Sequence, residues 1–146
     1  MNMMQVNYGA TGTSTAVDAL GMRDMQARAY AKRRERYLLL KAPPASGKSR
    51  ALMYLALDKL ERQGLRKVIV AVPERTIVGS FAPVRLTESG FFADWTPDLR
   101  YNLCTPGADA GKVARVVEVK ESEARLLICT HATLRFAYEN LATEDF

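Results

Sequence analysis

Short apolar runs alternate with segments of helical periodicity along most of the chain. Residues 37–40, 68–72 and 126–129 are such runs, and the first two are followed by prolines, which cannot donate to a strand ladder. Residues 48–63 carry apolar positions at helical spacing; residues 109–120 do so too, and although their valines also suit a strand, we expect a helix. Strands that alternate with helices predict βαβ units, and therefore an α/β fold with a mostly parallel, buried sheet.

The same patterns predict the remaining elements. Residues 17–36 show a partial apolar stripe beside a basic face, which indicates a long first helix. Residues 74–81 and 134–141 are also expected to be helical, residues 99–103 alternate as in a strand near a sheet edge, and Gly64 is placed to end the helix over 48–63. The helix positions expected to face the core are Leu20, Met25, Ala29, Ala31, Leu52, Leu55, Ala56, Leu60, Leu134, Ala137, Tyr138 and Leu141.

Composition and charge narrow the class of protein. The chain has 146 residues, 48% hydrophobic and 25% charged, which suits one globular domain over 17–146 after a polar, flexible tail over 1–16. Neither a membrane span nor a signal peptide is recognisable, so we expect a cytoplasmic protein without a membrane partner. A net charge of +5 fits an anionic partner such as nucleic acid without requiring one. Cys104 and Cys129 lie in apolar segments without metal-ligand spacing, which predicts buried reduced thiols.

Residues 42–49, Ala-Pro-Pro-Ala-Ser-Gly-Lys-Ser, match a phosphate-binding P-loop (Walker A motif) with alanine in place of the first glycine. Between a strand and a helix, the N–H groups of such a loop and the positive end of the helix dipole form a site for phosphate oxygens. Lys48 is expected to reach the outer phosphates and the Ser49 hydroxyl to bind Mg²⁺, which makes both candidate catalytic residues. The expected nucleotide contacts of the loop are Pro44, Ala45, Ser46, Gly47, Lys48, Ser49 and Arg50.

With this loop the sequence resembles superfamily 2 helicases and translocases, in the branch of DEAD/DEAH-like and type III restriction-related enzymes. Residues 22–26, Met-Arg-Asp-Met-Gln, precede the loop much as the glutamine motif of the family does. The resemblance implies that Gln26 reads the adenine edge of ATP, since an amide offers both a donor and an acceptor. Simple solvent exposure on a basic helix is the alternative for this residue. The resemblance also implies a P-loop NTPase (RecA-like) three-layer sandwich, here incomplete, that hydrolyses ATP with DNA or RNA as partner.

Two later segments are similar to family motifs that contact nucleic acid. Residues 72–76 imply backbone contacts from Pro73, Arg75 and Thr76, with Arg75 as the phosphate partner. Residues 130–135 are similar to a motif that grips one strand through a helix N-terminus, where hydroxyls and free N–H groups suit phosphate oxygens. Thr130, His131 and Thr133 are the candidates there, although His131, the one histidine of the sequence, also suits a structural turn.

The aromatic residues Phe91, Phe92 and Trp95 can stack bases in principle, but an apolar cluster under a long loop is the interpretation we favour. Two departures from the family stand out: Ala45 occupies a usual glycine position, and no Asp-Glu-x-Asp or Asp-Glu-x-His box follows residues 126–129. In the family that box lies just beyond the matched region, so the resemblance implies a piece of a longer protein, inactive alone, without the acidic box and the second motor domain. A small-molecule P-loop kinase and a non-catalytic nucleotide-binding or nucleic-acid-binding module remain alternatives.

Overall fold

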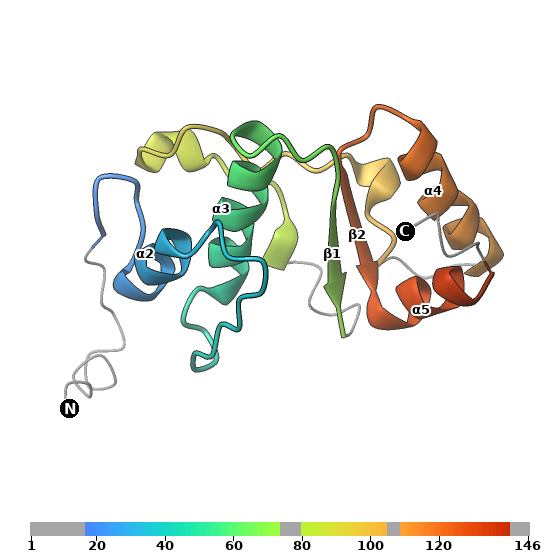
Figure 1. Cartoon of the computed structure of the whole chain (residues 1–146), viewed down its shortest axis with the longest axis horizontal. Coiled ribbons are helices and arrows are strands. Elements are labelled where there is room, and N and C mark those ends of the chain that lie inside the picture. Colours follow the sequence, from blue (N-terminus) through green and yellow to red (C-terminus); the bar gives the residue numbers. More distant parts are fainter. Residues whose placement is uncertain (1–16, 74–79, 105–108, 141–146) are drawn as a thin grey trace.

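A computed structural model describes residues 17–73, 80–104 and 109–140, so the expected tail over 1–16 lies outside the described residues. Helices α2 and α3 pack together on one side of a short parallel sheet, and α4 and α5 lie on its other side (Figure 1). In chain order the elements are α2 (Asp24–Ala31), α3 (Lys48–Glu61), β1 (Val68–Val72), the 3₁₀ helices η3 (Leu86–Ser89) and η4 (Leu99–Tyr101), α4 (Asp109–Glu121), β2 (Leu126–Thr130) and α5 (His131–Asn140).

The sheet consists of β1 and β2, which pair in parallel with Val68 opposite Leu126 and Val72 opposite Thr130. A parallel pair needs a long crossover, and α4 lies in the crossover here. The expected strands over 68–72 and 126–129, and the helices over 48–63 and 109–120, are confirmed within one or two residues at each end. The chain is therefore a mixed α/β protein, as predicted, with a small parallel sheet.

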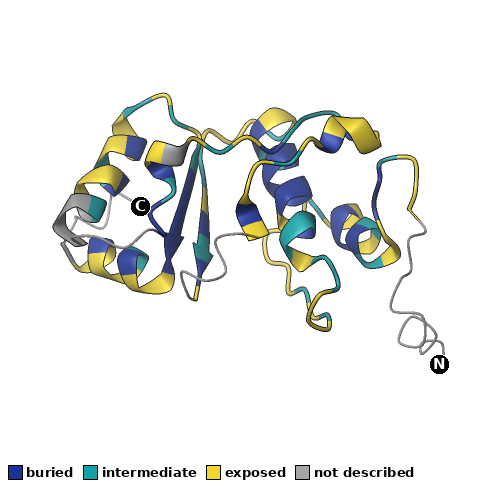
Figure 2. Ribbon diagram, turned by 180° about the vertical axis from the view of Figure 1, so that it is seen from behind, coloured by how far each residue is buried: buried dark blue, intermediate teal, exposed yellow. Residues whose placement is uncertain are grey.

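Apolar side chains from both faces of the sheet build two cores. On one face Val70, Val72 and Ile128 join the buried residues of α3, among them Met53 and Tyr54. On the other face Leu127 and Cys129 pack with Val116 and Val119 of α4 and with Ala137 of α5. Buried residues line the surfaces that face the sheet and exposed residues cover the outside (Figure 2). Helices thus cover both faces of the pair.

The strand expected over residues 37–40 is wrong. These residues have no regular secondary structure, and the exposed fractions of Tyr37 and Leu39 are 83% and 91%. Their apolar character suits a buried strand, but a strand also needs the edge of another strand with which to pair. Among the described residues, β1 pairs only with β2. Residues 37–40 instead run between α2 and the P-loop without joining the sheet.

The first helix is shorter than the predicted 17–36. The Asp18 carboxylate accepts hydrogen bonds from the N–H groups of Leu20 and Met22, and Gly21 has a φ of +79°, so residues 18–22 form a turn before α2. The third strand is replaced by η4 and one parallel bridge between Asn102 and Ile128. The predicted helix over 74–81 falls largely outside the described residues; Ser80 and Phe81 form a 3₁₀ turn.

Individual core predictions also differ in outcome. Ala31, Leu52 and Tyr138 were expected inside but are exposed, while Leu141 lies outside the described residues. Phe91 and Trp95 are apolar core residues, as expected, but they belong to the core that includes α3 and the sheet and not to a separate cluster; the Trp95 indole N–H donates to the Phe81 carbonyl at 2.9 Å. Cys104 and Cys129 are free and buried, and desolvation raises the pKa of Cys129 to about 12. Within the described ranges, no helix is long and apolar enough to cross a membrane.

Candidate nucleotide site and sheet edge

The P-loop reverses the chain immediately before α3 with two left-handed residues. Ala45 has a φ of +61° and Gly47, the N-cap of α3, has a φ of +94°. Alternation of left-handed and other conformations turns successive N–H groups toward the same side, which is the geometry of an anion-binding nest. Gly47 supplies no side-chain cap, and the first turn of α3 carries no acidic residue. The helix N-terminus therefore presents N–H groups and a positive dipole to whatever lies against the loop.

Side chains of the loop hold its shape. The Ser46 hydroxyl donates to the Pro43 carbonyl at 2.6 Å, and the Lys48 ammonium donates to the Ala42 carbonyl at 2.9 Å. Lys48 is exposed, and its flexible stem allows the ammonium to leave this carbonyl for a stronger acceptor such as a phosphate oxygen. Ser49 is half-buried in the first turn of α3, and its hydroxyl is an oxygen that can bind Mg²⁺.

Gln26 connects α2 directly to the P-loop. Its side-chain oxygen accepts from the Arg23 N–H at 2.8 Å, which caps the start of α2, and its side-chain nitrogen donates to the Gly47 carbonyl at 3.1 Å. A Cβ on Gly47 would lie 2.5 Å from the Gln26 nitrogen, which would have to move away, and the positive φ of Gly47 favours glycine in any case. Gln26 is only 3% exposed, which rules out the alternative of a solvated surface glutamine.

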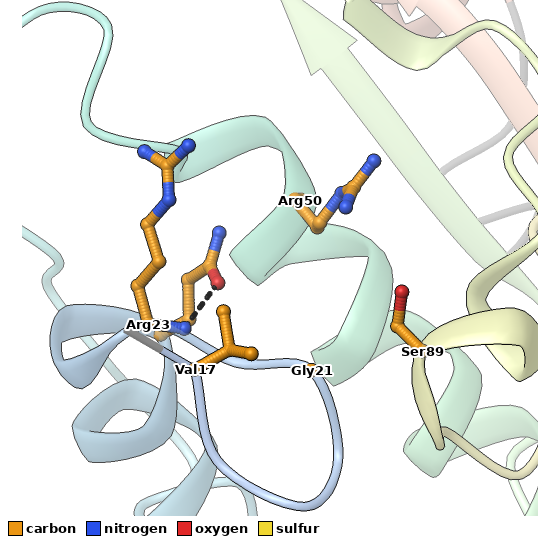
Figure 3. A pocket seen from close by; sticks show the side chains of 6 residues that line it. Val17, Gly21, Arg23, Arg50 and Ser89 are labelled. Carbon is orange, nitrogen blue, oxygen red and sulfur yellow. Dashed lines mark hydrogen bonds between the residues drawn. The ribbon is translucent and has the colours of Figure 1, made fainter. Parts of the chain in front are cut away.

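The Gln26 amide keeps capacity for a ligand. A carboxamide has two N–H donors and an oxygen with two lone pairs, and these two contacts use one donor and one lone pair. One donor and one acceptor remain. Gln26 also faces a polar pocket of about 470 Å³, whose described lining residues are Val17, Gly21, Arg23, Gln26, Arg50 and Ser89 (Figure 3). This volume lies within the usual range for small-molecule sites.

The carboxyl ends of β1 and β2 bring the candidate nucleic-acid contacts to one edge. Pro73 follows β1 and His131 follows β2, and because Val72 pairs with Thr130 the two lie at the same edge of the sheet. The first turn of α3 lies at this end of the molecule too (Figure 1). Pro73 and His131 are exposed. Arg75 and Thr76 lie outside the described residues.

Thr130 and Thr133 have a local structural role that sequence reasoning did not anticipate. The Thr130 hydroxyl accepts from the Thr133 N–H at 3.1 Å and lies 3.2 Å from the Thr133 hydroxyl, so Thr130 caps α5. Each residue is only 8% exposed. A threonine between a strand and a helix, with a second three residues later, is itself a capping signal.

Comparison with known proteins finds a relative that matches this chain along nearly its whole length. The chain is similar to a protein of Bacillus subtilis (strain 168) named "Putative ATP-dependent helicase YeeB", with 56% identical residues over 145 positions. These positions make up 99% of this chain and 24% of the Bacillus protein, so the chain spans about a quarter of the length of the relative it matches. No family model and no solved structure matches the chain.

Sequence reasoning missed Ser89 as a pocket residue and did not assign a role to Arg23. Arg23 is the N-cap residue of α2 and precedes Gln26 by three positions. That spacing is a capping signal that the sequence already contains. Ser89 reaches the pocket from η3, far along the chain, and no local pattern marks it.

Proposed function

We propose that this chain is the ATP-binding part of a nucleic-acid-dependent ATPase, a helicase or translocase acting on DNA or RNA. The observation that carries the proposal is the nest formed by Ala45 and Gly47 at the N-terminus of α3, with Lys48 and Ser49 in the first helical turn. The N–H groups of residues 45–49 hold the phosphates, Lys48 binds the outer phosphates, and Ser49 contributes one oxygen to Mg²⁺. Magnesium neutralises phosphate charge when it is bound.

Gln26 supports ATP as the nucleotide in this proposal. Adenine presents an amino donor beside a ring-nitrogen acceptor, and the free donor and acceptor of the Gln26 amide form the complementary pair. Because the same amide bonds the Gly47 carbonyl, base recognition is tied to the phosphate loop by one side chain. The likeness to the Bacillus protein named "Putative ATP-dependent helicase YeeB" supports the same choice.

We propose that the nucleic-acid partner binds at the carboxyl edge of the sheet. Pro73 and His131 are exposed there, and the N-terminus of α5 adds N–H groups to which a phosphate oxygen can bind. Thr130 and Thr133 support this surface as the cap of α5, and Arg75 and Thr76 belong to the proposal from the sequence alone. Within the described ranges, no group of three or more His, Cys, Asp or Glu residues is arranged to hold a metal. The resemblance to superfamily 2 helicases supports an acidic box and a second motor domain as further parts of the proposed ATPase.

The test of this function is binding of Mg²⁺·ATP to the purified chain by calorimetry. Lys48→Ala removes a charge-assisted contact to phosphate, so its affinity is expected to fall more than about tenfold while its unfolding transition is unchanged. Lys41→Ala, an exposed lysine outside the loop motif, is the matched control and is expected to bind as the parent does. Equal affinities for Lys48→Ala and the parent would contradict the proposal. Stimulation of ATP hydrolysis by single-stranded DNA or RNA, measured on the longer protein, distinguishes a motor from a kinase.

A further inference from the structure

The pocket beside Gln26 continues away from the P-loop and ends at a residue that no nucleotide-binding motif includes. Arg23 marks the near end, since one of its terminal nitrogens would lie 3.9 Å from a Cβ on Gly47. Arg50, on the first turn of α3, and Ser89, at the end of η3, line the far part (Figure 3). The pocket therefore lies beside the P-loop, to which Gln26 is joined through the Gly47 carbonyl.

The position of Ser89 is fixed by two close backbone contacts. A Cβ on Gly21 would lie 2.5 Å from the Ser89 Cβ, and a Cβ on Gly90 would collide with the Ala19 carbonyl oxygen. Both glycines have positive φ, +79° and +108°. The Tyr54 hydroxyl, one turn after Arg50 on α3, lies 3.4 Å from the Gly21 carbonyl and fastens the loop to that helix. The turn that contains Gly21 is thus held between α3 and η3, with Ser89 at the rim of the pocket.

The chemistry of the lining suits a neutral polar group attached to an anion. The side chains of Arg23 and Arg50 come from opposite sides of the pocket (Figure 3), Gln26 offers an amide, Ser89 offers a hydroxyl, and the described lining includes no acidic residue. Guanidinium planes stack on flat rings, and amide and hydroxyl groups bond ring and sugar edges. We infer that Ser89 is a selectivity residue that contacts the nucleoside part of the nucleotide in this pocket. The inference rests on the proposed function, because the P-loop must hold the phosphates.

A comparison of two ligands tests this inference on the 146-residue chain. Calorimetric titrations with Mg²⁺·ATP and with inorganic tripolyphosphate measure phosphate binding with and without a nucleoside. Ser89→Ala is expected to weaken ATP binding about three- to tenfold, as for one lost neutral hydrogen bond, and to leave tripolyphosphate binding unchanged. Ser89→Gln, which fills the rim, is expected to weaken ATP binding further. Glu88→Gln, on the same turn but outside the lining, is expected to bind both ligands as the parent does.

These titrations distinguish failure of the Ser89 inference from failure of the proposed function on which it rests. If both Ser89 variants bind ATP as the parent does, or if they lose ATP and tripolyphosphate equally, Ser89 is not a nucleoside contact. If the parent binds neither ligand, or if Lys48→Ala binds both as well as the parent, the proposed function fails and the inference fails with it. If the contact is confirmed, titrations with dATP and GTP show which part of the nucleoside Ser89 contacts. If ATP binds more tightly than dATP to the parent but not to Ser89→Ala, the contact is to the sugar. If the preference for ATP over GTP changes in Ser89→Ala, the contact is to the base.

Discussion

Ala45 adopts a backbone conformation that side chains with a Cβ disfavour. Its φ of +61° lies in the left-handed region, and it is the one non-glycine residue with positive φ among the described ranges. Such a conformation costs on the order of 1–3 kcal/mol and persists where the surrounding structure holds it. Here the Ser46–Pro43 hydrogen bond and the start of α3 hold the loop on either side. The strain is therefore located in the nest that we propose for phosphate.

Substitution of Ala45 tests whether this backbone conformation is strained. Ala45→Val places a β-branched side chain at positive φ and is expected to lower the free energy of unfolding by about 1–2 kcal/mol more than a valine in an ordinary helix position does. Chemical denaturation measures the change, and Ala132→Val, at an exposed position in the first turn of α5, is the control. Ala45→Gly is expected to fold and to bind ATP as the parent does, because glycine favours this conformation. Equal stability of the two valine variants would contradict the interpretation.

The contact between α2 and α3 depends on a buried carboxylate. Asp58 is 1% exposed and accepts from the Tyr30 hydroxyl at 2.8 Å and from the Gln63 amide at 2.7 Å, with the Arg33 guanidinium 3.6 Å away. Burial raises the pKa of Tyr30, and the hydrogen bond to Asp58 raises it further. Tyr30 follows Gln26 by one turn of α2. The same helix face thus carries the bond to α3 and the bond to the P-loop.

Removal of this carboxylate should destabilise the pair of helices. Asp58→Ala leaves the Tyr30 hydroxyl and the Gln63 amide without their acceptor, so the free energy of unfolding is expected to fall by about 1–3 kcal/mol. The control is Glu139→Ala, which breaks the exposed ion pair with Arg135 on α5 and should cost less than about 0.5 kcal/mol. Thermal or denaturant unfolding measures both. A loss for Asp58→Ala no larger than that of the control would show that the network contributes little.

Element prediction from sequence succeeded where the periodic pattern was bounded by strong local signals. Helix α3 begins at the glycine of the P-loop and ends near Gly64, and β1 stops at Pro73. It failed for residues 37–40, because an apolar run does not specify which strand edge receives it. It also failed to find Ser89 or the bond between Tyr30 and Asp58, since these contacts join segments far apart along the chain. Local patterns specify elements, whereas the pocket depends on how elements pack.

The whole chain is expected to bind nucleotide without turning it over. The nest and the helix dipole are local to the P-loop, whereas hydrolysis also needs a positioned water, metal-binding carboxylates and an added positive charge. In our proposal these groups are supplied from outside this chain, and an arginine finger alone contributes about three to five orders of magnitude in rate. Phosphate release from the purified 146-residue chain should therefore equal that of its Lys48→Ala variant. Steady release that this substitution abolishes would show that the catalytic groups lie within the chain.

The parallel pairing of β1 with β2 has a consequence for how the molecule is made. Val68 cannot meet Leu126 until residues 73–125 have been synthesised and the loop that they form has closed. Closure of a long loop costs conformational entropy before hydrogen bonds between the strands can compensate for it. Pairing of distant strands is therefore slow compared with formation of α3. On the ribosome β1 therefore emerges well before its partner, with both of its edges open and its valines exposed. In that interval the nascent chain depends on α3, which is already made, to cover one face of β1.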